Sequence, residues 1–154
     1  MKKAKTGKAE TADTMGMSGM LRVRVFRKGV LVDGWEDRNL IVSGGRAAAA
    51  ILIAGMGDGK RIAKIAFGTD GRVPTPDDTK ITGAFVKRLS DVSFPETGHA
   101  SFSWRLLESE ANGLKIAEFG LLCEDGTLWA RKIRGEALAK GSDISLEGEW
   151  VISH

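Results

Sequence analysis

The chain has 154 residues, of which 42% are hydrophobic and 28% charged, and its formal net charge at pH 7 is +3. A chain of this length buries roughly two-thirds of its unfolded surface in a single core, so one domain suffices. No apolar run approaches the ~20 residues of a membrane-spanning helix, and the N-terminus lacks the apolar segment of a secretory signal. We therefore expect synthesis in a reducing cytoplasm and no membrane partner.

The positive charge is concentrated at the N-terminus, where residues 1–10 carry four lysines against one glutamate: Lys2, Lys3, Lys5, Lys8 and Glu10. These ten residues account for the whole net charge, so residues 11–154 are near neutral. Folded nucleic-acid readers carry a basic face on the domain itself, and no aromatic residue interleaves with these lysines for base stacking. The pattern favours a tail that is solvated or bound to protein over a nucleic-acid partner.

Residues 1–19 have no hydrophobic period and too few apolar side chains to offset the entropy of ordering them. We expect a flexible basic arm here, followed by one domain over residues 20–154. The arm contains the lysines named above and two methionines, Met15 and Met17, with Met20 directly after it. It is the first candidate surface for binding a partner.

The domain begins with two strands and a helix. Residues 21–26 alternate apolar and basic side chains, as in a half-buried strand, and a turn at residues 27–29 returns the chain as a hairpin. A short strand over residues 39–42 precedes Ser43, which suits the N-cap of a helix over residues 44–54. Four consecutive alanines favour that helix, and Gly55 is suited to end it.

After the helix the sequence predicts only strands. Residues 61–67 form one, and a loop over residues 69–80 follows, in which Pro74 and Pro76 break regular structure. Further strands are expected near residues 82–94, 99–107, 114–123, 127–134 and 143–153. About seven or eight strands at this spacing predict a mainly β fold, a single β-sandwich or an open barrel, with one α-helix.

Candidate catalytic and metal-binding motifs are weak. The glycine-rich segment at residues 55–59 lacks the lysine and Ser/Thr of a phosphate-binding loop and follows a helix instead of preceding one. Asp70, Asp77 and Asp78 share a loop, but their spacing does not match the alternating ligands of a calcium loop. We expect neither a metal nor a cofactor, and Asp77 and Asp78 suit a turn or a cap.

Single reactive side chains also lack partners in the sequence. The one cysteine, Cys123, lies in an apolar strand, where a buried inert thiol is expected. His99 and His154 stand near no serine or cysteine motif. Glu118 is a charge within an apolar strand, and we expect it to anchor the sheet, with Arg131 as a candidate partner, instead of acting as a general base. The sequence does not indicate an enzyme.

Three segments, taken in order, resemble small virion proteins of tailed bacteriophages, including the N-terminal regions of some tail-fibre and collar proteins. They are NLIVSGGRAAAAILIAG, IAKIAFGTDGRVPTPDDT, and KIAEFGLLCEDGTLWARK followed near the end by LEGEWVIS. The resemblance spans residues 38–153. The matching positions are Phe67, Gly68, Thr69, Pro74, Asp78, Thr79, Glu118, Gly120, Gly126, Leu128, Ala130, Arg131, Trp150 and Ile152.

The resemblance implies a non-enzymatic structural protein of a virion, an adaptor of the tail, collar or fibre-attachment region. No fibre shaft or receptor-binding tip follows residue 154, so an adaptor is expected over a host-recognition protein. The partners would be other virion proteins and copies of the chain itself, bound through the arm and exposed strand edges. The loop over residues 68–80 is a second candidate surface, with Asp70, Arg72, Asp77 and Asp78 as contact residues.

Three alternatives remain open at this point. The first is a capsid decoration or cement protein on the head surface. The second is a module that binds a carbohydrate or a metal on the loop at residues 70–78. The third is a nucleic-acid-associated protein that uses the basic arm, whose binding would weaken steeply with added salt.

Overall fold

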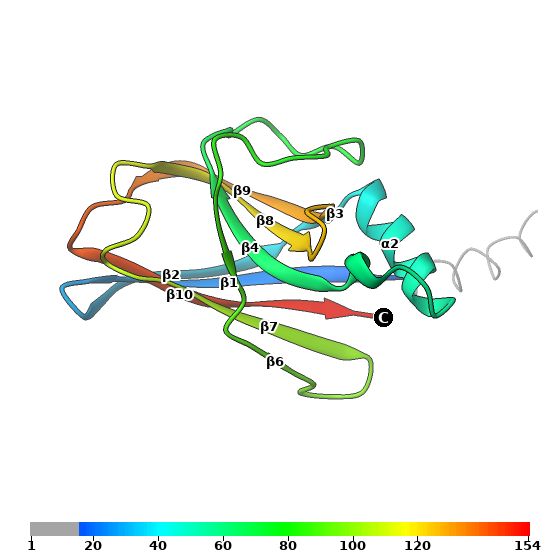
Figure 1. The fold of residues 1–154 in the computed structure, drawn as a ribbon. Helices are drawn as coiled ribbons and strands as arrows, with labels where there is room; N and C mark the ends of the chain where they lie inside the picture. The colour runs from blue at the N-terminus through cyan, green and yellow to red at the C-terminus, as the bar shows by residue number, and fades with distance from the viewer. Residues whose placement is uncertain (1–15) are drawn as a thin grey trace, which may run out of the picture.

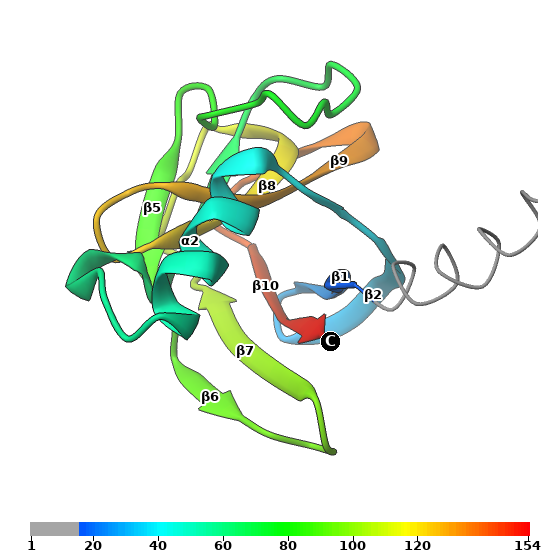
Figure 2. The ribbon, with the colours of Figure 1, turned by 90° about the vertical axis from the view of Figure 1, so that its right-hand side faces the viewer.

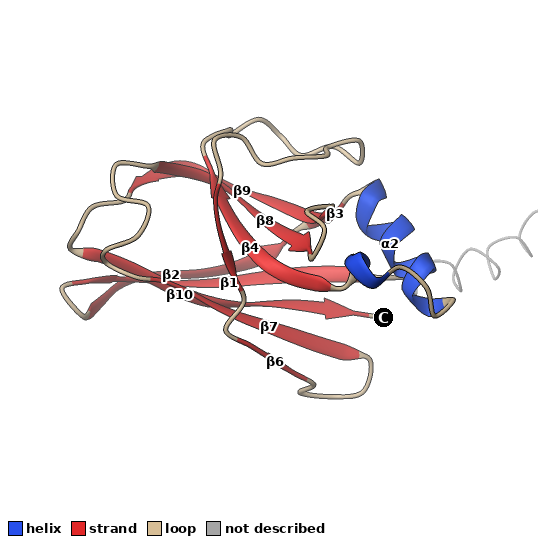
Figure 3. Cartoon of the chain, in the orientation of Figure 1, coloured by secondary structure: helices blue, strands red, loops and turns tan. Residues whose placement is uncertain are grey.

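The computed structural model describes residues 16–154, which form two antiparallel five-stranded sheets packed face to face (Figure 1). The arm lysines and Met15 lie outside the described residues. Sheet A has the strand order β2-β1-β10-β7-β6, and sheet B has the order β3-β9-β8-β4-β5. The expected mainly β sandwich with one α-helix is therefore confirmed; Figure 3 shows the helix at one end of the sandwich.

Sheet A consists of β1 (Ser18–Arg27), β2 (Val30–Arg38), β6 (Asp91–Ser93), β7 (His99–Leu106) and β10 (Ile144–Ser153). Sheet B consists of β3 (Leu40–Ile41), β4 (Ile62–Gly68), β5 (Phe85–Arg88), β8 (Lys115–Cys123) and β9 (Leu128–Ala139). Helix α2 (Ser43–Ile53) and the short helix η1 (Asp58–Lys60) lie between β3 and β4. No helix among residues 16–154 is both long and apolar enough to cross a membrane.

Several boundaries differ from the sequence expectation. Strand β1 begins at Ser18, inside the expected arm, and β9 extends to Ala139. The segment expected as one strand near residues 82–94 contains two short ones, β5 and β6, which belong to different sheets. Residues 16–154 contain ten strands, where about seven or eight were expected. A segment that passes from one sheet to the other forms two short strands, although its sequence pattern resembles that of one.

The β1–β2 hairpin follows the sequence pattern closely. Lys28 and Gly29 both have positive φ, +51° and +79°, which is the backbone of a type I′ turn and matches the twist of the two strands. Leu21, Val23 and Val25 alternate inward along β1 and are at most 2% exposed. Strand β2 is different: it is an outer strand of sheet A, and only Trp35 along it is partly buried.

The core between the sheets is built around four large aromatic rings. Phe119 contacts Trp35, Phe67 and Trp104 at ring-centroid distances of 5.7, 5.8 and 6.2 Å. The first two contacts are edge-to-face, a geometry favoured by the ring quadrupoles. Gly148 on β10 makes this packing possible, because a Cβ there would lie 2.0 Å from the Arg22 carbonyl oxygen and 2.7 Å from the Trp104 ring.

Helix α2 packs on β9 through glycine. A Cβ on Gly45 would lie 2.3 Å from the Trp129 carbonyl oxygen, so only glycine allows this approach. The expectation that Ser43 caps the helix is wrong: Val42 occupies the cap position without a side-chain hydrogen bond, and Ser43 is the first helical residue. The Ser43 N–H instead donates to the Pro76 carbonyl oxygen. Gly55 follows the helix with φ +77°, as expected for its end.

The loop between β4 and β5 covers the outer face of sheet B (Figure 1). A second, smaller apolar cluster lies under it: Val42, Ala66, Ile81, Leu122 and Leu128. Ile81 enters this cluster against Gly68 and Gly120, where a Cβ would lie 2.4 Å from its side-chain carbons. The loop is thus packed on the sheet, and it brings its aspartates against the same outer face.

Candidate functional site

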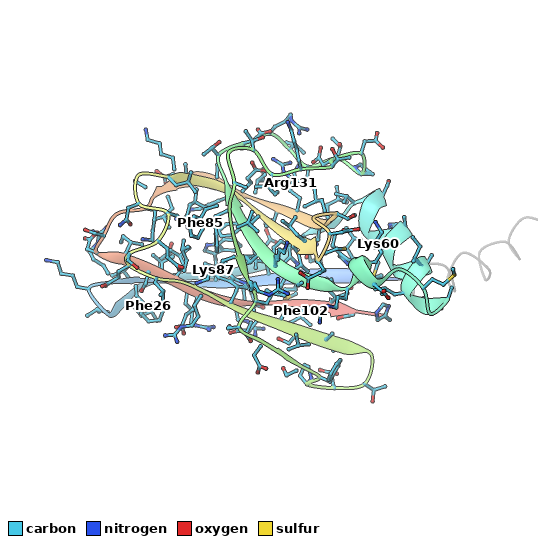
Figure 4. The ribbon with its side chains drawn as sticks, in the orientation of Figure 1. Phe26, Lys60, Phe85, Lys87, Phe102 and Arg131 are labelled. Carbon is cyan, nitrogen blue, oxygen red and sulfur yellow. The ribbon has the colours of Figure 1, made fainter. Side chains whose placement is uncertain are left out.

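The outer face of sheet B carries a group of bonded charged residues, here called the charged cluster, in which three members are buried and two are partly or largely exposed. The buried members are Asp78, Glu118 and Arg131, and the others are Asp70 and Arg72. Arg131 on β9 is at its centre, 1% exposed, beneath the β4–β5 loop (Figure 4). Its Nε donates to Glu118 at 2.7 Å, and its Nη1 donates to Asp78 at 3.1 Å. Two more hydrogen bonds reach backbone carbonyls of the loop, those of Arg72 at 2.9 Å and Asp70 at 2.8 Å.

Glu118 joins the loop to the sheet from the opposite side of the guanidinium. It is fully buried on β8, and its Oε2 accepts the backbone N–H groups of Asp70 and Thr82, both at 2.9 Å. One carboxylate oxygen is therefore used by Arg131 and the other by both ends of the loop. The expected anchoring role of Glu118, with Arg131 as its partner, is confirmed.

Asp78 completes the charged cluster from within the loop. It is 9% exposed and accepts the Thr75 N–H at 2.9 Å, the Thr75 hydroxyl at 3.1 Å and Arg72 Nη2 at 3.2 Å. Burial opposes its ionisation, but the hydrogen bonds from Thr75 and Arg72 outweigh it, so the pKa of Asp78 lies below its ordinary value. The expectation that Asp78 forms a turn or a cap is confirmed.

These contacts define what the charged cluster can do chemically. Its carboxylates and guanidinium are already bonded to one another and to the loop backbone, as in a buried ion pair that fixes one conformation. Among residues 16–154, no group of three or more His, Cys, Asp or Glu side chains is arranged to hold a metal ion. The cluster is therefore a clamp that holds the loop.

The candidate partner-binding residues fall in different environments. Asp77 is exposed, and the side chains of Asp70 and Arg72 are 30% and 57% exposed, whereas that of Asp78 is 6% exposed and bonded inside the cluster. Met17 and Met20 are partly buried, and Met17 packs on the main core. Of these residues, three lie on the β4–β5 loop with charged side chains that a partner protein could reach: Asp70, Arg72 and Asp77.

Cys123 has the expected environment of an inert thiol. Its side chain is fully buried, and burial, together with the charge of Asp125, raises the pKa of the thiol to about 11. A thiol of this kind is almost wholly protonated at neutral pH and is a poor nucleophile. The imidazole of His99 lies 3.0 Å, through Nδ1, from the Thr97 carbonyl oxygen.

Sequence reasoning missed an apolar groove at the end of the sandwich that carries α2. The groove has a volume of about 350 Å³ and lies between α2, the β6–β7 hairpin and the end of β10; these elements surround the C-terminus in Figure 2. Among its lining residues are Leu52, Ile53, Val92, Phe94, Phe102 and Ile152. We call it the apolar groove.

Large apolar side chains are exposed around the groove. Ile53 is 84% exposed and Phe94 is 76% exposed, and both line the groove. Contiguous exposed apolar surface of this kind marks interaction sites on soluble proteins. The sequence contains the apolar residues of this surface in two separate segments, Ile51–Ile53 and Val92–Phe94. These segments are far apart along the chain, and only the fold brings them together.

One acidic side chain lies beside the groove, in the turn between β6 and β7. Glu96 follows Phe94 by two residues, is exposed, and forms no ion pair among residues 16–154. Asp91 is not a second one, because it precedes the groove residue Val92 on β6 and strand alternation directs it to the opposite face of sheet A. Arg61 lines the groove as well, but its guanidinium is paired with Glu124 at 2.9 Å. The β6 side of the groove therefore presents unneutralised negative charge beside apolar surface.

Comparison with protein-family models, with curated proteins and with solved structures finds no match to this chain.

Proposed function

We propose that this protein is a non-enzymatic structural component of a bacteriophage virion, an adaptor of the tail, collar or fibre-attachment region that binds neighbouring protein subunits. The observation that carries the binding role is the apolar groove, with Ile53 and Phe94 exposed beside it. The virion setting rests on the resemblance of residues 38–153 to small phage virion proteins.

The distribution of charge supports a protein partner. The strongest electrostatic arrangement among the described residues, the charged cluster, is used to hold the loop. The largest exposed apolar side chains gather at the α2 end instead. Burial of such side chains drives protein association, at roughly 25 cal/mol per Å² of apolar surface removed from water.

The test is the composition of purified particles of the virus that encodes the chain. We expect quantitative mass spectrometry to find the chain in a fixed ratio to the other structural proteins. Ile53→Asp with Phe94→Asp should remove it from particles, because two exposed apolar contacts become charged. Val86→Asp is the matched control, since Val86 is 43% exposed on β5 in the other sheet. Presence of the chain in infected cells but not in particles would contradict the proposal.

A decoration protein on the capsid head is the second candidate. In that role the same groove would bind a protein of the head shell. A number of copies per particle that matches the head-shell protein, instead of the tail proteins, would favour this candidate. The exposed Arg72 and Asp77 and the partly buried Asp70 would then be tested as contacts to the shell by charge reversal in the same particle assay.

A further inference from the structure

A second exposed apolar surface lies at the opposite end of the sandwich from the apolar groove. It is the tip of the β1–β2 hairpin, residues 27–32, here called the hairpin tip (Figure 1). Val30, Leu31 and Val32 are 64%, 56% and 53% exposed. Three consecutive exposed aliphatic residues on an outer strand are unusual, because such edges are normally protected by charge, proline or cover.

The two surfaces differ in shape. The hairpin tip projects from one end of the sandwich (Figure 1), whereas the groove is a hollow lined by residues of α2, β6, β7 and the end of β10. At about 350 Å³ the groove is at the small end of the roughly 300–1,000 Å³ range of ligand pockets. It suits a few aliphatic side chains better than a large ligand.

The charges of the two surfaces are complementary. Lys28, in the turn of the hairpin tip, is exposed and forms no ion pair among the described residues. Glu96, beside the groove, is exposed and equally without an ion-pair partner among those residues. A lysine placed against an unneutralised carboxylate orients an encounter and penalises the reversed arrangement.

From these observations we infer that the apolar groove of one copy binds the hairpin tip of a second copy. The contact is heterologous, because the two surfaces differ and lie at opposite ends of the sandwich. A heterologous contact leaves one free surface of each kind after every addition, so copies join head to tail into a ring or an open filament. This inference rests on the proposed assembly role and names the partner as the chain itself.

Two single substitutions separate this arrangement from a two-fold dimer. Leu31→Asp places a charge on the hairpin tip and leaves the groove unchanged. Phe94→Asp places a charge in the groove and leaves the hairpin tip unchanged. Both side chains are more than half exposed, so we expect both variants to fold, which thermal unfolding checks. The measurement is sedimentation velocity of each full-length protein over a series of concentrations.

We expect the wild-type protein to grow in mass with concentration beyond a dimer and each variant alone to remain monomeric. An equimolar mixture of the two variants should form dimers and stop there, because only one productive pair of surfaces remains. Val86→Asp should assemble like the wild-type protein. Lys28→Glu should weaken assembly roughly two- to fivefold, as for an exposed ion pair, and Lys28→Glu with Glu96→Lys should recover it.

A monomeric mixture would overturn the inference, as would assembly by either variant alone. Dimers of Phe94→Asp but not of Leu31→Asp would show pairing of β2 with β2 instead. A wild-type protein that stays monomeric at every concentration would also overturn it, yet the chain could still be found in particles. Failure of self-association is thereby distinguished from failure of the proposed function.

Discussion

Arg131 shows how one buried residue organises a large part of sheet B. It is 1% exposed, and four hydrogen bonds connect it to Glu118, Asp78 and the backbone of the β4–β5 loop. An unpaired charge at this depth would be costly, so the residues that surround it are not interchangeable.

Glu118→Ala should lower the free energy of unfolding by about 3–5 kcal/mol, because the buried Arg131 loses its shortest carboxylate contact and the loop N–H groups of Asp70 and Thr82 lose their acceptor. Urea unfolding measures the loss. Glu118→Ala with Arg131→Met should lose less than the sum of the two single variants. Glu36→Gln, at an exposed pair with Arg22, is the control and should cost about 0–1 kcal/mol. Equal losses for Glu118→Ala and Glu36→Gln would contradict the buried role.

The pH dependence of stability should contain a contribution from Asp78. Because its folded pKa is lowered, the ionised form stabilises the fold fully above the unfolded value of about 3.9 and loses this effect as pH falls through the folded value. Asp78→Asn should therefore flatten the fall in unfolding free energy below about pH 4. Asp77→Asn is the matched control. An unchanged slope in Asp78→Asn would count against this account.

Cys123 should not react with thiol reagents in the folded protein. The pKa of about 11 and full burial of the side chain leave little thiolate and no access. We expect no reaction with a disulfide reagent at pH 8 until denaturant is added, and then one thiol per chain. Rapid labelling under native conditions would show that the strand opens.

At the scale of elements, glycine decides how closely α2 and β9 approach. Gly45→Ala would normally stabilise a helix by up to ~1 kcal/mol. Here the added Cβ would meet the Trp129 carbonyl oxygen at 2.3 Å, so we expect a loss of about 1–3 kcal/mol from overpacking. Thermal unfolding checks it. Ala47→Gly at an exposed helix position is the control, with an expected loss of about 1 kcal/mol from propensity alone.

The elements also show which features the sequence could predict. Alternation along β1 and the glycine after Lys28 predicted the first hairpin, and Gly55 predicted the end of the helix, because these patterns act locally. The crossing of β5 and β6 between sheets was not predictable, since their exposed and buried residues depend on which neighbours the fold supplies. Ser43 is not the cap because the helix begins one residue earlier than expected, and the Pro76 carbonyl oxygen accepts the Ser43 N–H, which has no partner within the helix.

At the scale of the whole molecule, the charged cluster could be predicted in part from the sequence, whereas the apolar groove could not. The loop aspartates and Arg131 were visible as charges, and the pairing of Glu118 with Arg131 was predictable from neighbouring strands. The apolar groove was not, because Ile53 and Phe94 join only when α2 closes the end of the sandwich beside β6. The opposition of the groove and the hairpin tip is likewise a property of the fold (Figure 1).

Disulfide trapping between copies tests the head-to-tail contact most directly. Leu31→Cys and Phe94→Cys proteins are mixed under mild oxidation; buried Cys123 does not compete. We expect the mixed disulfide, between a Leu31→Cys copy and a Phe94→Cys copy, to form much faster than a disulfide between two identical variants. It should also form faster than any disulfide of the Val86→Cys control. Mixed and symmetric disulfides that form at equal rates, or no faster than the control, would contradict it.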